Sequence, residues 1–334
     1  MHERRSRRAR RIFFAVFPVL ILFACVGRSE TVSIRIAYAT TSGVRLPLFI
    51  AADARLFEKY GLDAKLVNIA SGNTAISALV TGEIDVISGS GSASIVASAR
   101  GLPVVIVGSF GSTIYKLVAN PGISDLRGKT VGTSRPGTTT DFAMRRALLK
   151  LGWVPDKDVK ILPTGIGEAD KRIMLMPQGR MDATLASPES ILTAESQTKV
   201  KLESLADLEE LKIYNTVGDL SVKADALKTR RDLLRAFFMA SSEAIWLGKK
   251  DRIVAQKVIG KYLRTSDRKR IEIVYDASLG RMPTKPYPRE EAIQLEIENV
   301  AYTDPLLKNK KASDFMDSSI VAELERRGFF GRLQ

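Results

Sequence analysis

A repeated order of strand, polar loop and helix is the feature that most restricts the fold of this chain. Residues 32–39 alternate branched or aromatic side chains with small or charged ones, which predicts a short strand. A polar loop and a helix over 46–60 follow, and Gly61 is placed to end that helix. The pattern continues with strands at 63–69, 84–88 and 104–109 and helices at 75–81 and 90–100. This rhythm predicts a parallel sheet with helices on both faces.

The rhythm restarts after a break at Asn120-Pro121-Gly122. Strands are expected at 130–133, 159–162, 181–186 and 213–222, with helices at 138–151 and 168–176. Beyond Lys228 the pattern is mostly helical. A length of 334 residues suits two domains better than one. We therefore predict an α/β protein made of two similar, doubly wound units.

The first 25 residues have the composition of an export signal. Six arginines precede residue 12, and residues 12–24 form a run of thirteen without a charge. That run is shorter than the about 20 apolar residues of a membrane span, so residues 1–24 are predicted to be a signal peptide. The run ends at the only cysteine, and Leu22-Phe23-Ala24-Cys25 resembles the lipobox of bacterial lipoproteins. The resemblance implies a lipid on Cys25; the alternative is a plain signal peptide with an incidental cysteine.

The positions of histidine and cysteine exclude several kinds of chemistry. The only histidine is His2, so cleavage after residue 24 leaves no imidazole and a single thiol. Ser-His-Asp and Cys-His catalysis and a zinc site of His or Cys ligands are thereby excluded. No catalytic residue, metal or cofactor is expected. The leader accounts for +5 of the net charge of +14, and the remaining +9 is spread among acids, which argues against a nucleic-acid partner.

Several predicted strand-to-helix junctions are rich in serine, threonine and glycine. They lie at residues 40–42, 71–74, 88–92 and 133–140. In a doubly wound sheet such junctions meet at the carboxyl ends of the strands, where helix N-termini present free N–H groups. The combination predicts a cradle for a small anion or an oxygen-rich group. The alternative is that each junction is an ordinary cap or turn.

A family resemblance rests on blocks in a fixed order. They are residues 47–51 with 56–62, 71–73 with 79–85, 132–142 with 151–153, and 179–183 with Ser187-Pro188. The chain resembles the nitrate/sulfonate/taurine-type substrate-binding proteins of ABC transporters, a group that includes NMT1/THI5-like binders. The resemblance implies two α/β lobes joined by a two-crossing hinge, the type II binding-protein fold. Crossings at 120–123 and 215–219 would make lobe I residues 31–119 plus 217–334 and lobe II residues 120–216.

The candidate ligand contacts come mainly from the polar junctions. They are Thr41, Ser42, Arg45, Gly72, Asn73, Ser90, Gly91, Arg135, Gly137, Thr138, Thr139 and Glu189. The two arginines could pair with a carboxylate, sulfonate or phosphate, or could be solvated surface residues. Glu189 could favour a ligand amine or ring N–H, or simply suit a helix N-terminus. Phe110 could stack on a ring or belong to the core.

The resemblance implies an extracytoplasmic receptor that traps a small organic anion or heteroaromatic and delivers it to an ABC permease. Its expected location is the periplasm or the outer face of the cell membrane, as a monomer anchored through Cys25. Two alternatives remain open. One is an enzyme on the same fold, similar to pyrimidine synthases, and the other is a sensing lobe for a membrane signalling partner.

Overall fold

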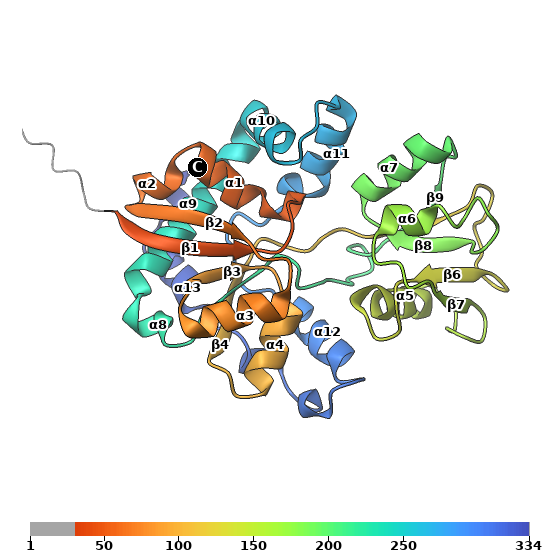
Figure 1. The fold of residues 1–334 in the computed structure, drawn as a ribbon, viewed down its shortest axis with the longest axis horizontal. Coiled ribbons are helices and arrows are strands. Elements are labelled where there is room, and N and C mark those ends of the chain that lie inside the picture. The colour runs from red at the N-terminus through yellow and green to blue at the C-terminus, as the bar shows by residue number, and fades with distance from the viewer. Residues whose placement is uncertain (1–30, 334) are drawn as a thin grey trace, which may run out of the picture. The chain divides into compact units, whose positions relative to one another are not determined.

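The computed structural model describes residues 31–333, which form two mixed sheets flanked by helices (Figure 1). The predicted signal peptide and Cys25 lie outside the described residues. The first sheet has the order β2 (Leu62–Asn68), β1 (Val32–Tyr38), β3 (Val86–Ser88), β10 (Asp219–Lys223), β4 (Val104–Ser109). The second has the order β7 (Lys160–Pro163), β6 (Thr130–Thr133), β8 (Ala183–Ala186), β5 (Lys116–Ala119), β9 (Glu203–Asp207). The prediction of two α/β units is confirmed.

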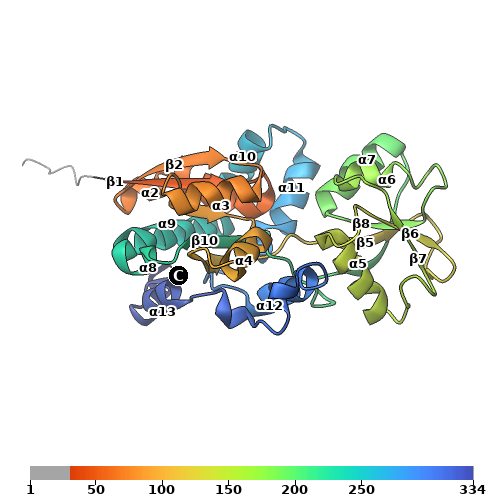
Figure 2. The same ribbon diagram turned by 60° about the horizontal axis from the view of Figure 1, so that its bottom comes forward.

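We call each sheet with its helices a lobe. Lobe I contains α1 (Leu46–Asp53), α2 (Leu56–Lys59), α3 (Gly72–Thr81), α4 (Gly91–Ala99), α8 (Ala226–Thr229), α9 (Arg231–Lys250), α10 (Arg252–Tyr262), α11 (Arg268–Ala277), α12 (Glu290–Val300) and α13 (Ser319–Arg326). Lobe II contains α5 (Thr139–Lys150), α6 (Ala169–Ile173) and α7 (Pro188–Thr198). Figure 2 shows the C-terminal helices packed beside the N-terminal strands of lobe I, so this lobe is built from both ends of the described chain.

Local sequence explains where several helices begin and end. The Ser71 hydroxyl accepts a hydrogen bond from the Thr74 N–H at 3.3 Å and caps α3, which ends at Gly82 with a φ of 82°. Ser187 caps α7 in the same way through the Ser190 N–H at 3.2 Å, and Pro188 occupies its first turn. These caps fix the positions at which the two helices begin.

The core of lobe I forms around α1 and α9. Phe49, Phe237 and Phe238 are fully buried there, together with Ile34 and Ile36 of β1. At about 25 cal/mol per Å² of apolar surface, burial of each such ring contributes on the order of 3 kcal/mol. Lobe II has its own core around Met144, Leu148 and the central strands, so each lobe packs around a separate apolar interior.

The predicted position of the first crossing is wrong. β5 pairs antiparallel with β8 and β9 and therefore belongs to the second sheet, so the chain crosses between Ser109 and Lys116. The break at Asn120-Pro121-Gly122 is a turn inside lobe II, where the Asn120 N–H donates to the Asp182 carbonyl at 2.9 Å and Gly122 has a φ of 80°. A Pro-Gly break indicates a turn, but it does not indicate whether the chain passes to the other lobe at that turn.

The chain returns to the first sheet between β9 and β10. The stretch between them spans residues 208–218, and its first part belongs to lobe II, where Leu208 and Ile213 pack in the core. The predicted crossing at 215–219 agrees with the rest of this stretch, except that Asp219 begins β10. After this crossing, β10 lies between β3 and β4 and pairs antiparallel with both, so the first sheet is mixed and not purely parallel. Within residues 31–333, no helix combines the length and the apolar character that a membrane span requires.

Candidate functional site

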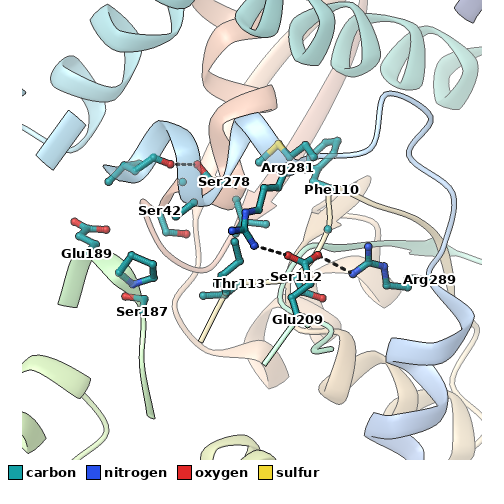
Figure 3. Close-up of a pocket in the computed structure, with 18 residues that line it drawn as sticks. Ser42, Phe110, Ser112, Thr113, Ser187, Glu189, Glu209, Ser278, Arg281 and Arg289 are labelled. Carbon is teal, nitrogen blue, oxygen red and sulfur yellow. Dashed lines mark hydrogen bonds and ion pairs between the residues drawn. The ribbon is translucent and has the colours of Figure 1, made fainter. Parts of the chain in front are cut away.

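A pocket at the crossings is lined by both lobes, and we call it the site pocket (Figure 3). Its cavity volume is about 110 Å³. Lobe I contributes the loop 42–44 after β1, the end of α11, and Arg281, Met282 and Arg289. Lobe II contributes residues 187–189 at the start of α7 and Glu209, while residues 110–114 of the first crossing form part of the wall. A molecule bound here would contact both lobes and the segment that joins them.

Two arginines of lobe I converge on one carboxylate of lobe II (Figure 3). Arg281 Nη1 lies 3.1 Å from Glu209 Oε2 and 3.5 Å from Asp207 Oδ2. Arg289 Nη1 lies 3.8 Å from Glu209 Oε1, and its guanidinium stacks over the Tyr214 ring at 4.4 Å. Guanidinium groups in this arrangement suit an anionic group with two oxygens. An anion entering the pocket could therefore replace the Glu209 carboxylate between them.

Glu189 is already engaged by the protein. Arg270 of α11 donates from Nε and Nη2 to Glu189 Oε1 at 3.1 and 2.5 Å. Both side chains are partly exposed, and the pair joins α7 of lobe II to lobe I. A ligand amine would have to displace Arg270 to reach Glu189, and whether Glu189 contacts a ligand stays a prediction.

A second group of charges lies buried beside the crossings. Arg45 is 1% exposed and Asp219 is fully buried. Arg45 Nε and Nη1 and both Asp219 carboxyl oxygens lack hydrogen-bond partners among the described residues. Arg45 reaches the loop before α4 because Gly89 has no side chain; a Cβ there would overlap its guanidinium. These groups do not line the site pocket.

Burial shifts the protonation of this pair. It raises the pKa of Asp219 to about 8; the charge of Glu296 adds to the shift, whereas the Ser109 side chain, Arg45 and Arg289 oppose it. Burial lowers the pKa of Arg45 to about 10, and Asp219 opposes that change. At neutral pH the carboxyl is therefore mostly protonated and the guanidinium keeps its charge.

The predicted contacts are divided among several places. Ser42 and Glu189 line the site pocket, as does Phe110. Gly91 packs against Thr216 and Asp219, and Gly72 packs against Ser90. Thr139 lines a small cavity with Asn215 and Glu296, and Gly137 lines an outer groove between α5 and α12. Thr41, Asn73 and Arg135 are exposed. Whether these residues contact a ligand stays a prediction.

The polar junction at 133–141 satisfies its own hydrogen bonds. The Ser134 hydroxyl lies 2.8 Å from that of Thr138 and 2.7 Å from that of Thr140. Thr138 also donates to the Arg135 carbonyl at 2.7 Å, and Asp141 accepts from the Gly137 N–H at 3.0 Å. These contacts fit the alternative reading of an internally braced helix start.

Several residues of the pocket are not among the contacts predicted from the sequence. They are Ser112, Thr113, Glu209, Ser278, Arg281 and Arg289. The available signal was weak: Arg281 and Arg289 flank a stretch with prolines at 283, 286 and 288, a pattern that predicts extended chain but no ligand site. Among the described residues, no cluster of three or more His, Cys, Asp or Glu side chains is arranged to hold a metal ion.

Two lobes, two crossings and a shared pocket define the class of the periplasmic binding protein fold. The aliphatic sulphonate binding protein SsuA from Escherichia coli has this fold; it is 20% identical, with a TM-score of 0.66 over 87% of this chain and 99% of that one. The nitrate-binding protein NrtA from Synechocystis PCC 6803 is 15% identical, with a TM-score of 0.63 over 89% of each chain. At these identities the likeness shows the fold alone.

The sequence profile described as NMT1/THI5 like matches residues 44–248, and the chain belongs to this family. A Brucella abortus relative, which its name describes as a candidate binding protein, is 30% identical over 157 residues. That match covers 46% of this chain and 48% of the relative, so the chain spans about half the length of the relative it matches.

Proposed function

We propose that this protein is the extracytoplasmic solute-binding receptor of an ABC importer, with a small organic anion or heteroaromatic as its ligand. The observation that carries the proposal is the site pocket, in which Arg281 and Arg289 of lobe I meet Glu209 of lobe II. Membership of the NMT1/THI5-like family supports it, as do neighbours named for sulphonate and nitrate binding.

The lining of the pocket suits a molecule with an anionic end and an apolar body. Arg281 and Arg289 offer N–H donors for carboxylate or sulfonate oxygens, and serine hydroxyls at 42, 112, 187 and 278 add polar contacts. Phe110, Val274 and Met282 line the same pocket and offer apolar surface. Few convergent polar groups within a largely apolar wall are typical of small-molecule sites.

Ligand capture would work by a change in the angle between the lobes. A ligand held by residues of both lobes binds the closed form more tightly than the open form, and it shifts the population by that difference in affinity. Replacement of Glu209 by a ligand anion would keep the arginines paired in the closed state. The closed, loaded form is the one that a membrane permease would recognise.

The remaining parts of the proposal concern location and chemistry. Export by the leader and a lipid on Cys25 would hold a monomeric receptor at the outer face of the membrane. We propose no catalysis, since residues 31–333 contain neither histidine nor cysteine. Mass spectrometry of the purified protein's N-terminus tests the leader and the lipid: acylated Cys25 is expected, and an unmodified chain that retains residues 1–24 would contradict it.

Titration calorimetry of the purified protein tests the proposal directly. A panel of taurine, short alkanesulfonates, nitrate, carboxylates and thiamine-precursor pyrimidines should yield at least one saturable ligand with Kd below about 10 μM. Mass spectrometry of the same mixtures should recover each ligand unchanged. Absence of binding across the panel, or turnover of a bound molecule, would argue against a transport receptor.

A further inference from the structure

The two crossing segments are hydrogen-bonded to each other along their length. At the lobe I end, the Phe110 N–H donates to the Gly218 carbonyl at 2.9 Å. At the lobe II end, the Leu208 N–H donates to the Tyr115 carbonyl at 2.9 Å. Between these backbone bonds, the connection depends on the side chains of Ser112 and Asn215.

Asn215 provides most of this central connection. Its Nδ2 donates to the Thr113 carbonyl at 2.7 Å, and its Oδ1 accepts from the Thr113 N–H at 3.1 Å. Oδ1 also accepts from the Val217 N–H at 3.3 Å, within its own segment. The Ser112 hydroxyl donates to the Asn215 carbonyl at 2.9 Å and lies 3.2 Å from the Asn215 nitrogen as acceptor. One buried amide therefore serves both polar groups of the Thr113 backbone, as a paired strand would.

The packing around Asn215 leaves little freedom. The side chain is only 5% exposed. Gly218 lies so close to the Gly111 carbonyl that a Cβ would overlap it, and a Cβ on Gly91 would meet Thr216 at 2.5 Å. Loss of the amide would leave the partly buried Thr113 N–H and C=O without their partner, which is unfavourable.

The connection reaches the ligand site through its neighbours. Ser112 and Thr113 line the site pocket, whereas Asn215 does not. Asn215 can therefore act on a ligand only by placing these two residues and by holding the crossings together. We infer that Asn215 is a positioning residue that clamps the two crossing segments into a single hinge and fixes the Ser112–Thr113 wall of the pocket. The effect on ligand rests on the proposed function, but the clamp itself does not.

Charged groups near Asn215 affect the design of a test. Glu296 of α12 lines the same small cavity, Arg289 stacks over the adjacent Tyr214, and Asp219 begins β10 four residues later. Glu296 and Asp219 titrate in the wild type as well. Every measurement is therefore taken as the difference from wild type at the same pH.

The test uses Asn215→Asp, because its proton state switches the clamp. A neutral aspartic acid can donate its O–H to the Thr113 carbonyl and accept from the Thr113 N–H, as asparagine does. An ionised carboxylate has no proton to donate and faces that carbonyl unpaired. Asn120→Asp is the matched control, since Asn120 donates to the Met176 and Met181 carbonyls wholly within lobe II.

The first readout is the distance between the lobes, measured by electron spin resonance without any ligand. Spin labels at Lys65→Cys and Arg180→Cys in a Cys25→Ser background report one exposed position in each lobe. Asn215→Asp should match wild type at pH 5 and show a broader distribution at pH 8, whereas Asn120→Asp should match wild type at both. Distributions that match wild type both in Asn215→Asp at pH 8 and in Asn215→Ala at either pH would overturn the clamp. Asn215→Ala should be broad throughout; should it fail to fold, the Asn215→Asp comparison still decides.

The second readout is the affinity for methanesulfonate by calorimetry. Asn215→Asp should bind about tenfold more weakly than wild type at pH 8 and equally at pH 5. Equal affinity at both pH values beside a confirmed distance change would overturn the role in placing Ser112 and Thr113. Failure of the wild type to bind methanesulfonate or any of the panel would count against the proposed function and leave the distance result standing.

Discussion

Two sets of an arginine and a carboxylate lie close to the crossings, and they differ in exposure and in their hydrogen-bond partners. Arg281 and Glu209 line the site pocket, are partly exposed and lie 3.1 Å apart across the lobes. Arg45 and Asp219 are buried within lobe I, and most of their polar atoms have no partner. The accessible pair can exchange partners with an incoming ion, because water compensates each charge during the exchange. The buried pair cannot exchange partners in this way. A proton kept on Asp219 reduces the free-energy cost of burying its carboxyl group.

The comparison separates two roles of arginine and carboxylate side chains in this protein, one in stability and one in ligand affinity. If it is correct, changes to the buried pair alter stability and its pH dependence, while changes to the accessible pair alter ligand affinity and leave stability nearly constant. Each prediction below tests one side of this division, in order of decreasing effect.

Arg45→Ala should cause the largest loss of stability. It removes one of the bulkiest fully buried side chains and leaves a cavity, at a cost of about 3 kcal/mol of unfolding free energy. Arg45→Met fills similar volume without the unpartnered charge and should lie within about 1 kcal/mol of wild type. Denaturant unfolding measures both. Arg100→Ala, a change at an exposed arginine, is the control and should cost less than about 1 kcal/mol. An Arg45→Met variant as unstable as Arg45→Ala would mean that the charge itself is needed.

Asp219 should make the protein less stable as the pH rises. Its pKa is about 8 in the folded protein, against about 3.9 for an unfolded aspartate, so the folded state holds the extra proton between these values. Unfolding then becomes easier with increasing pH through this window, by about 1 kcal/mol per pH unit between pH 5 and 7. Arg45, Arg289 and Glu296 also act on this carboxyl.

Asp219→Asn should remove that part of the pH dependence. Urea unfolding of wild type and variant at pH 5, 6 and 7 gives the two slopes, and the variant should show the smaller one. Asp63→Asn changes an exposed carboxylate of β2 and should keep the wild-type slope. Parallel slopes for wild type and Asp219→Asn would show that Asp219 is already ionised in the folded protein.

The accessible pair should respond in affinity, with opposite signs for its two members. Arg281→Gln removes a donor to the anion and should weaken methanesulfonate binding about tenfold, while Glu209→Gln removes the internal competitor and should strengthen it. Calorimetry measures the affinities, and thermal unfolding checks that both variants keep wild-type stability. Arg268→Gln, near the start of α11 and outside the pocket, is the matched control. Weaker binding in both variants would show that Glu209 contacts the ligand and does not compete with it.

The same contrast explains what the sequence could and could not predict. The strand of residues 32–38, the helix after residue 46 and the helix after the polar loop at 71–74 depend on neighbours within a few positions, and local patterns predicted them. The membership of β5 in the second sheet depends on pairing with residues 183–186 and 203–207, far along the chain. The local pattern around residue 120 carries no information about that pairing, so the crossing was predicted at 120–123, after its actual position between Ser109 and Lys116.

The candidate site shows this limit more strongly. Ser42 lies in a predicted polar loop and Glu189 follows the end of a predicted strand, so the local pattern could suggest both. Arg281 and Glu209 are 72 positions apart, and nothing beside either residue indicates the other. Arg45 was predicted from its place beside a polar loop, yet its guanidinium lies against Gly89 and near the charge of Asp219, and only the folded sheet brings these residues to it.

Loss of the cross-lobe pair of Glu189 and Arg270 should have the smallest effect on stability, and it tests whether this pair behaves like the accessible or the buried charges. Both side chains are partly exposed, so the pair should contribute only about 0.5 kcal/mol to stability. Because it joins α7 to α11, Glu189→Gln should instead widen the distance distribution between spin labels in the two lobes, and added salt should widen that of wild type. Glu195→Gln, also on α7 but paired with Lys201 inside lobe II, should change neither. A loss of stability above about 2 kcal/mol in Glu189→Gln would place this pair with the buried charges and not with the exchangeable ones.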